Sequence, residues 1–211
     1  MINHLRFADD IVVIASSEQE LKEMLDQLCA ESAKVGLKMN MNKTKIMNNK
    51  LCPLNNINVN GEVLQKVENY IYLGHQINCD NNNILEINRR IGLGWAIFGK
   101  HREIFKSNMP ISLKTKLYNQ VILPVITYGS ETWTLTKESI TKLQVAQRAM
   151  ERQMLGISLR DRKENIWVRE QTKVLDIIES IKWNKWKWAG HIQRMTDERW
   201  TKTLTNWRPW Y

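Results

Sequence analysis

Two adjacent aspartates, Asp9 and Asp10, interrupt the most strand-like stretch of the chain, RFADDIVVIA at residues 6–15. Valine, isoleucine and phenylalanine are favoured in strands, whereas aspartate is depleted from them. A tight turn joining two short strands explains this pattern better than one continuous strand. We therefore expect a hairpin with both carboxylates at its tip. Most such pairs are solvated turn residues, but carboxylate oxygens are also hard ligands of the kind that Mg²⁺ prefers.

A helix is expected directly after this hairpin, in the segment SSEQELKEMLDQLCAESAKVG. Ser17 and Glu20 have the spacing of a capping box, in which each residue satisfies a backbone N–H at the start of a helix. Apolar residues then recur at helical spacing. Gly36 is placed to end the helix.

The following residues predict short strands. Apolar and polar residues alternate over residues 37–41, which is the period of a half-buried strand, and the alternation is lost at Asn42 and Lys43. The Asn-Gly pair at residues 60–61 is a strong signal for a two-residue hairpin turn. A further short strand is expected at residues 70–77. The first 80 residues are therefore predicted to mix helix and strand.

Beyond residue 83 the pattern becomes helical. Apolar residues recur at helical spacing over residues 84–106, with Asn83 as a candidate cap. Pro110 can open a second helix, which Pro124 is expected to end or kink. Further helices are expected over residues 140–155 and 174–181. We predict an α+β chain with a domain boundary near residues 80–85.

The positive charge is concentrated in the last third of the chain. Residues 137–211 hold 16 Lys and Arg against 9 Asp and Glu, so +7 of the total +9 lies there together with seven of the nine tryptophans. A basic surface of this kind indicates either a polyanionic partner or a solvated face.

The segment KWNKWKWAGHIQRM concentrates both features, with Lys182, Lys185 and Lys187 interleaved with tryptophans. Tryptophans stacking on bases and lysines contacting phosphates would bind a single strand. Alternatively, Trp183 and Trp186 form a buried stripe, with the lysines reaching solvent, because tryptophan gains much free energy from burial. Both interpretations hold together if Trp188 faces outward.

Composition excludes several other classes of protein. No apolar run approaches the roughly 20 residues that a membrane helix needs, and nothing at the start has the pattern of a secretory leader. Cys29, Cys52 and Cys79 are scattered and lack the paired spacing of a zinc site, so a reducing interior fits them better than disulfides or zinc do.

Several segments resemble the reverse transcriptases of non-LTR (LINE-type) retrotransposons, and they occur in the order of that family. They are Phe7-Ala8-Asp9-Asp10 with its apolar continuation, GLKMNMNKTKIM at residues 36–47, the turn at residues 72–74, YGSETWTL at residues 128–135 and WAGHIQRMTDERW at residues 188–200.

This resemblance implies an RNA-directed DNA polymerase that performs two-metal nucleotidyl transfer on an RNA template and a DNA primer, using deoxynucleotides and Mg²⁺. Asp9 and Asp10 would be the metal ligands, with Asp9 the principal one. Lys43 would protonate the leaving pyrophosphate, although it could equally be a solvated lysine. The residues implied to contact nucleic acid are Phe7, Ala8, Tyr72, Leu73, Gly74, Lys182, Lys185, Lys187 and Trp188.

The resemblance also implies a domain division. Residues 1–83 would be the C-terminal part of a polymerase palm, residues 84–136 a helical thumb, and residues 137–211 a basic, Trp-rich helical extension. A complete site uses a third carboxylate from an upstream strand, and only eight residues precede Asp9. We therefore expect a C-terminal fragment, intracellular and nuclear, that is inactive alone. A non-catalytic nucleic-acid-binding remnant, or a remnant without a stable fold, is the alternative.

Overall fold

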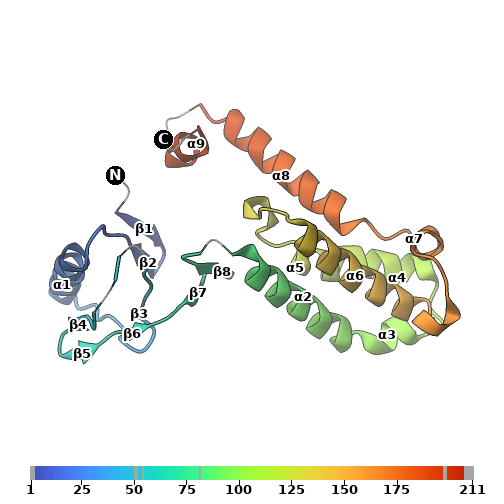
Figure 1. Ribbon diagram of the computed structural model, residues 1–211, viewed down its shortest axis with the longest axis horizontal. Helices are drawn as coiled ribbons and strands as arrows, with labels where there is room; N and C mark the ends of the chain where they lie inside the picture. The colour runs from blue at the N-terminus through green and yellow to red at the C-terminus, as the bar shows by residue number, and fades with distance from the viewer. Residues whose placement is uncertain (1–2, 50–51, 54, 81, 197–198, 207–211) are drawn as a thin grey trace. The chain divides into compact units, whose positions relative to one another are not determined.

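The protein forms two compact units, unit 1 (Met1–Asn82) and unit 2 (Asn83–Tyr211). The computed structural model in Figure 1 describes residues 3–49, 52–53, 55–80, 82–196 and 199–206. Unit 1 mixes strands with one long helix, whereas the described part of unit 2 is helical. The predicted α+β class is therefore confirmed.

The strands of unit 1 form four separate two-stranded pairs, of which three are antiparallel hairpins. The hairpins are β1 (His4–Phe7) with β2 (Asp10–Val13), β4 (Asn58–Val59) with β5 (Glu62–Val63), and β7 (Asn69–Tyr72) with β8 (His75–Asn78). The fourth pair is parallel and joins β3 (Lys45–Ile46) to β6 (Gln65–Lys66).

The predicted helix is α1 (Glu18–Lys34), and local chemistry sets both of its ends. The Ser17 side chain accepts a hydrogen bond from the Glu20 N–H, as expected. The other half of the predicted capping box is wrong, because the Glu20 carboxylate accepts hydrogen bonds from the backbone and hydroxyl of Ser16 instead. These bonds lower the pKa of Glu20. At the other end Gly36 has a φ of 76°, which lets the chain turn out of the helix.

In unit 1 one predicted turn is confirmed, whereas two predicted strands are wrong. The Asn-Gly pair at residues 60–61 forms the predicted hairpin turn, with φ of 53° and 85°. Residues 70–77 form a hairpin and not one strand, because Leu73 and Gly74 adopt φ of 47° and 74°. Residues 37–41 form no strand. The predicted break at Asn42 and Lys43 is a turn over residues 41–43.

The core of unit 1 explains why the residue pattern wrongly predicted a strand at residues 37–41. Five buried side chains form this core: Leu25, Ile46, Ile57, Val59 and Leu64. Met39 and Met41 pack against it from an irregular segment, whereas Leu37 is 67% exposed. Alternate residues can thus face a core without any strand pairing.

The described part of unit 2 is built from helices, most of which pack around one core (Figure 1). They are α2 (Asn83–Lys100), α3 (Arg102–Lys106), α4 (Ile111–Leu117), α5 (Leu123–Ile126), α6 (Lys137–Met154), α7 (Asn165–Thr172), α8 (Ile177–Gln193) and α9 (Trp200–Asn206), with the short turns η1 (Tyr118–Ile122), η2 (Ser130–Thr132) and η3 (Leu159–Asp161). No described helix is long and apolar enough to cross a membrane.

Pro124 shapes the second helical segment of unit 2. Proline has no N–H to donate and clashes with the preceding turn of a helix. The chain responds with the π-helical turn η1 between α4 and α5, so the helix that Pro110 opens is continued through a wide turn. The segment ends at Thr127, close to the predicted place.

The core of unit 2 crosses the expected boundary between residues 136 and 137. Ile87, Ile126 and Trp133 precede this boundary, and Leu143 and Ile177 follow it, yet all are fully buried in one cluster. The division into palm, thumb and extension stays a prediction.

Replacing Gly94 with alanine is expected to lower the free energy of unfolding of unit 2. A Cβ at Gly94 would lie 2.4 Å from Cγ1 of the fully buried Ile126, where α2 packs against α5. Overpacking of this kind costs about 1–3 kcal/mol. Urea unfolding followed by tryptophan fluorescence measures it, because all nine tryptophans lie in unit 2.

Gly92 and Gly99 provide matched controls in the same helix. A Cβ at either position meets no atom within 4 Å. Alanine there is expected to stabilise the helix by up to about 1 kcal/mol. Equal destabilisation by all three substitutions would contradict the packing explanation.

Candidate nucleic-acid interface

Asp9 and Asp10 lie at the tip of the β1–β2 hairpin, as predicted. Phe7 pairs with Asp10, so Ala8 and Asp9 form a two-residue turn. Ala8 has a φ of 52°, in the left-handed region that two-residue hairpin turns use. Residues other than glycine adopt this conformation at a cost in free energy. Both aspartates are exposed. The turn therefore presents two adjacent carboxylates to solvent.

The hairpin lies outside the core of unit 1. Leu5, Phe7 and Ile11 are 43%, 63% and 42% exposed. Its base is held by the Ile14 N–H, which donates to the Asn3 carbonyl at 2.8 Å. The Ser16–Glu20 hydrogen bonds then connect its second strand to α1. A locally anchored hairpin thus presents both acidic and apolar side chains.

The donor set at the tip fits magnesium. Mg²⁺ in polymerase-type sites takes one or two carboxylates and fills its remaining positions with water and substrate phosphates. Asp9 and Asp10 carry two such carboxylates on adjacent, exposed residues. Among the described residues no group of three or more His, Cys, Asp or Glu is placed to hold a metal ion.

Lys43 lies in a tight turn directly before β3. Its backbone N–H donates to both the carbonyl and the side-chain oxygen of Asn40, at 3.1 and 3.2 Å. The Thr44 N–H and hydroxyl also donate to the Asn40 carbonyl. Asparagine favours such turns because its side chain can replace a backbone acceptor. The lysine side chain is left exposed on a fixed backbone.

Tyr72, Leu73 and Gly74 form the tip of the β7–β8 hairpin. Tyr72 ends β7 and is half-buried, while Leu73 is 39% exposed at the first turn position. Unit 1 thus contains three exposed bends that carry predicted site residues: the β1–β2 tip, the turn at Lys43 and the β7–β8 tip.

The lysines predicted to bind nucleic acid differ in their surroundings on α8. Lys182 forms an ion pair with Glu179 at 2.8 Å, and this contact raises the pKa of Lys182. The Lys185 ammonium donates to the Trp133 carbonyl. Lys187 is exposed and lines a groove of unit 2 together with Trp188.

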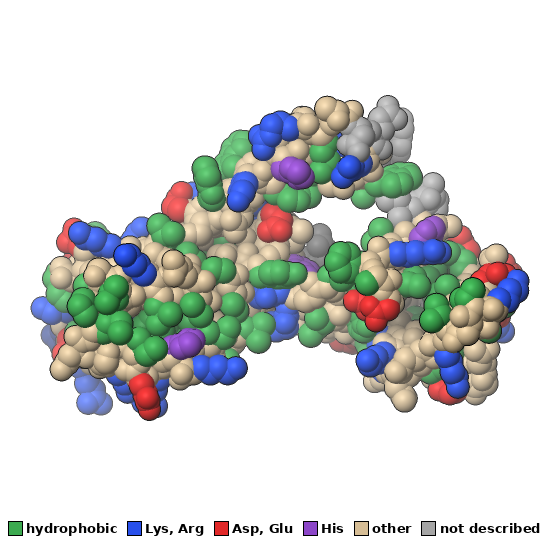
Figure 2. Space-filling model, turned by 180° about the vertical axis from the view of Figure 1, so that it is seen from behind, with side chains coloured by type: hydrophobic (Ala, Val, Ile, Leu, Met, Phe, Trp, Pro, Cys, Tyr) green, Lys and Arg blue, Asp and Glu red, His purple; other side chains and the backbone are tan. Residues whose placement is uncertain are grey.

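The expected burial of two tryptophans is wrong. Trp183 and Trp186 are 69% and 75% exposed, and Trp188 is 39% exposed. The apolar face that α8 buries consists of isoleucines: Ile177, Ile178, Ile181 and Ile192. Figure 2 shows hydrophobic, basic and histidine side chains interspersed along this helix.

Two segments singled out in the sequence come together in unit 2. Residues 128–135 include η2, and η2 packs against α8. The Asn184 amide donates to the Ser130 hydroxyl at 3.4 Å. Tyr128 and His191, which were not predicted as site residues, line the groove between these segments. His191 lies on one face of α8 with Trp183 and Lys187, so the helical period would have indicated it, whereas Tyr128 lies on the opposite wall of the groove.

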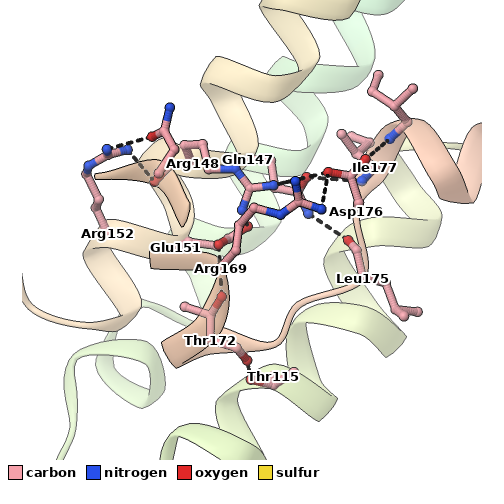
Figure 3. A network of polar contacts seen from close by, with 12 residues as sticks. Thr115, Gln147, Arg148, Glu151, Arg152, Arg169, Thr172, Leu175, Asp176 and Ile177 are labelled. Carbon is pink, nitrogen blue, oxygen red and sulfur yellow. Dashed lines mark hydrogen bonds and ion pairs between the residues drawn. The ribbon is translucent and has the colours of Figure 1, made fainter. Parts of the chain in front are cut away.

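The sequence analysis also missed a buried polar network that anchors α8 (Figure 3). Arg148 donates to the fully buried Glu151 at 2.5 Å and forms an ion pair with Asp176 at 3.3 Å. The Thr172 hydroxyl donates to the other oxygen of Glu151 at 2.9 Å. Asp176 also pairs with Arg169 and caps α8. The network joins α6, α7 and the start of α8.

Comparison with known proteins supports the reverse transcriptase resemblance. The family of reverse transcriptases (RNA-dependent DNA polymerases) matches residues 1–77, which contain all three exposed bends of unit 1. An uncharacterized transposon-derived protein of Caenorhabditis elegans is 36% identical over 217 residues, covering 99% of this chain and 78% of that protein. No solved structure matches the chain. The chain therefore belongs to a family of transposon-derived proteins, and its residues 1–77 match the reverse transcriptase family.

Proposed function

We propose that the chain is part of an RNA-directed DNA polymerase of a non-LTR retroelement, in which Asp9 and Asp10 bind Mg²⁺ at the primer end. The observation that carries this proposal is the pair of exposed carboxylates at a hairpin tip, with Asp9 in the two-residue turn and Asp10 as the first residue of β2, within the residues that the reverse transcriptase family matches. When bound, magnesium in such sites stabilises charge on the attacking and leaving oxygens.

Specific roles follow for the residues near the tip. Asp9 is the principal ligand and Asp10 the second. Phe7 and Ala8 form the floor beneath the primer end, and the exposed Phe7 ring would cover this floor. Lys43 Nζ gives a proton to the leaving pyrophosphate, because general acids assist leaving groups in this way.

The remaining proposed contacts are with template and primer. Tyr72, Leu73 and Gly74 position the primer backbone. Unit 2 acts on the template–primer duplex with residues 84–136 as thumb and residues 137–211 as a basic extension. The substrates are deoxynucleotides, an RNA template and a DNA primer, and the place of action is the nucleus.

The experiment that tests this proposal is primer extension with Mg²⁺, deoxynucleotides and a primed RNA template. We expect residues 1–211 alone to give no extension above a buffer blank, because two carboxylates alone bind magnesium weakly and lack a nucleotide platform. A chimera in which residues 1–77 replace the matching residues of an active reverse transcriptase should extend the primer. A folded chimera without activity, beside an active parent, would contradict the proposal.

A second candidate function is a nucleic-acid-binding protein without catalytic turnover. The exposed tryptophans and basic residues of α8 favour it, since neither depends on the hairpin carboxylates. Binding that is unchanged by Asp9→Asn and by removal of magnesium, combined with an inactive chimera, would select this function.

A further inference from the structure

An open groove of about 840 Å³ lies between α8 and the chain segment from Asn119 to Glu131. Both walls belong to unit 2. Hydrogen bonds hold the walls together, since Asn119 accepts from the Leu175 N–H at 3.2 Å and Asn184 donates to Ser130. The groove is therefore a built feature of this unit.

One face of α8 forms the first wall. The residues that line the groove from this helix and its cap recur three or four positions apart: Asp176, Glu179, Ser180, Trp183, Asn184, Lys187, Trp188 and His191. The same face continues into a second hollow of about 320 Å³, lined by His191, Arg194 and Arg199 among others. His191 lines both hollows, so they adjoin along α8 and are together called the path.

Aromatic side chains stand on both sides of this groove. Trp183 and Trp188 lie on α8, and Tyr128 lies on the opposite wall with 52% of its surface exposed. The Arg90 guanidinium lies 4.4 Å from the centre of the Tyr128 ring and holds the ring in place. Large aromatic side chains left exposed around a hollow mark an interaction site.

Charge varies along the path. At its first end Asp176 is paired with Arg148 and Arg169, and Glu179 is paired with Lys182. From residue 182 to residue 196 the sequence contains no acid. The second end therefore presents the cationic side chains Lys187 and Arg194, together with His191.

A glycine favours the position of Arg194. A Cβ at Gly190 would lie 3.1 Å from Arg194 Nη1, so the guanidinium lies back against the helix at the level of Gly190. This brings it beside His191 at the second hollow. On the opposite wall Glu131 would repel phosphates, so a bound strand must direct its bases toward that side.

We propose that this groove binds single-stranded nucleic acid, with bases stacked among Tyr128, Trp183 and Trp188 and phosphates along Lys187, His191 and Arg194. Aromatic platforms combined with cations are how single strands are bound with little sequence preference. A peptide partner would explain the aromatic groove but not the cluster of Lys187, His191 and Arg194 at its second end. The inference does not depend on the proposed polymerase, because none of these residues lies in unit 1.

Fluorescence anisotropy of the full chain with a labelled single strand of about 10 nucleotides tests the proposal, using DNA, RNA and a duplex of equal length. Trp183→Ala and Trp188→Ala should each weaken single-strand binding about 5- to 150-fold, the loss expected for one stacked base. Trp186→Ala is the matched control, because this equally exposed tryptophan of α8 does not line the groove. It should leave the affinity unchanged.

Lysine variants test the phosphate path. Lys187→Gln should reduce the magnitude of the salt dependence, the slope of log K against log salt concentration, by about 0.7, which corresponds to one phosphate contact on a single strand. Lys142→Gln should not change this slope, because Lys142 is paired with Glu138 at 2.9 Å on α6 and lies outside the groove. Unfolding curves that match the unchanged protein establish that the variants fold.

Three results would overturn the proposal. Trp186→Ala could weaken binding as much as Trp183→Ala, which would assign binding to the helix as a whole. Binding could require Asp9 or magnesium, which would assign it to the hairpin. Sedimentation could show a dimer that Trp183→Ala dissociates, which would make a second copy of the chain the occupant. Failure of the polymerase assays alone leaves this proposal intact.

Discussion

Replacing Asp9 with asparagine in the chimeric polymerase is expected to lower the rate of primer extension about 10³-fold. Metal ions supply several kcal/mol of stabilisation to the charge that develops in a transition state. Loss of about 4 kcal/mol corresponds to this factor, because each 1.36 kcal/mol is tenfold in rate. An asparagine at the exposed turn keeps the size of the side chain and removes the charged ligand, so the hairpin itself should persist. Single-turnover extension across a magnesium titration measures the effect.

Asp26→Asn is the matched control for this substitution. Asp26 is exposed on α1 in the same unit, and its replacement removes the same charge without touching the hairpin. It should leave extension unchanged. An equal loss in both variants would show that the net charge of unit 1, and not a metal ligand, controls the rate.

Replacing Arg148 with methionine is expected to lower the free energy of unfolding of unit 2 by about 3–5 kcal/mol. The Arg148 side chain is 8% exposed and its partner Glu151 is fully buried, so the substitution leaves a buried carboxylate without its cation. Breaking a buried ion pair from one side carries this cost. Urea unfolding at neutral pH, followed by tryptophan fluorescence, reports on unit 2.

The pH dependence gives this prediction a second readout. Burial raises the pKa of Glu151 above its ordinary value of 4.5, and Arg148 opposes that rise. Without Arg148 the pKa rises further, so the folded state favours the protonated form more strongly. The free energy that protonated Glu151 contributes to folding is fully present below the pKa of Glu151 in the unfolded chain. It is lost as the pH rises through the pKa of Glu151 in the folded protein. The deficit of the variant should therefore shrink as the pH is lowered.

Arg152→Met supplies the control on the same helix. Arg152 is half-buried and donates to the side chain of Asn165 at 2.8 Å. Its two further bonds, to the carbonyls of Arg148 and Lys163, are long at 3.4 Å, so its loss should cost at most about 3 kcal/mol, as for one hydrogen bond to a charged group. A deficit in Arg148→Met that is no larger, and that does not depend on pH, would contradict the buried-pair explanation.

Features set by neighbouring residues could be predicted from the sequence. The hairpin at Asp9 and Asp10, the Ser17 cap and the Asn-Gly turn all depend on residues within a few positions of one another. The resemblance placed a turn at residues 72–74, but the local pattern predicted one strand over residues 70–77, because leucine rarely adopts a φ of 47° and gives no turn signal before the glycine.

Features set by distant residues could not be predicted in the same way. Burial favours any tryptophan, but α8 buries its isoleucines and leaves Trp183 and Trp186 exposed. The groove joins Tyr128 to His191, and the Glu151 network joins three helices. Such contacts depend on how the helices pack, which the local pattern of residues does not specify.

Asp176 fixes the residue at which α8 begins. This start determines the direction in which the side chains farther along the helix point. The Asp176 carboxylate fixes the first helical residue by accepting from the N–H groups of Ile178 and Glu179, while Arg148 and Arg169 hold the carboxylate itself. Each residue of an α-helix advances the side-chain direction by about 100°. One inserted residue early in α8 would therefore swing Trp183, and everything after it, out of the groove without altering any of their identities. The position of each side chain along α8 therefore matters for binding in the proposed groove as much as its chemical identity does.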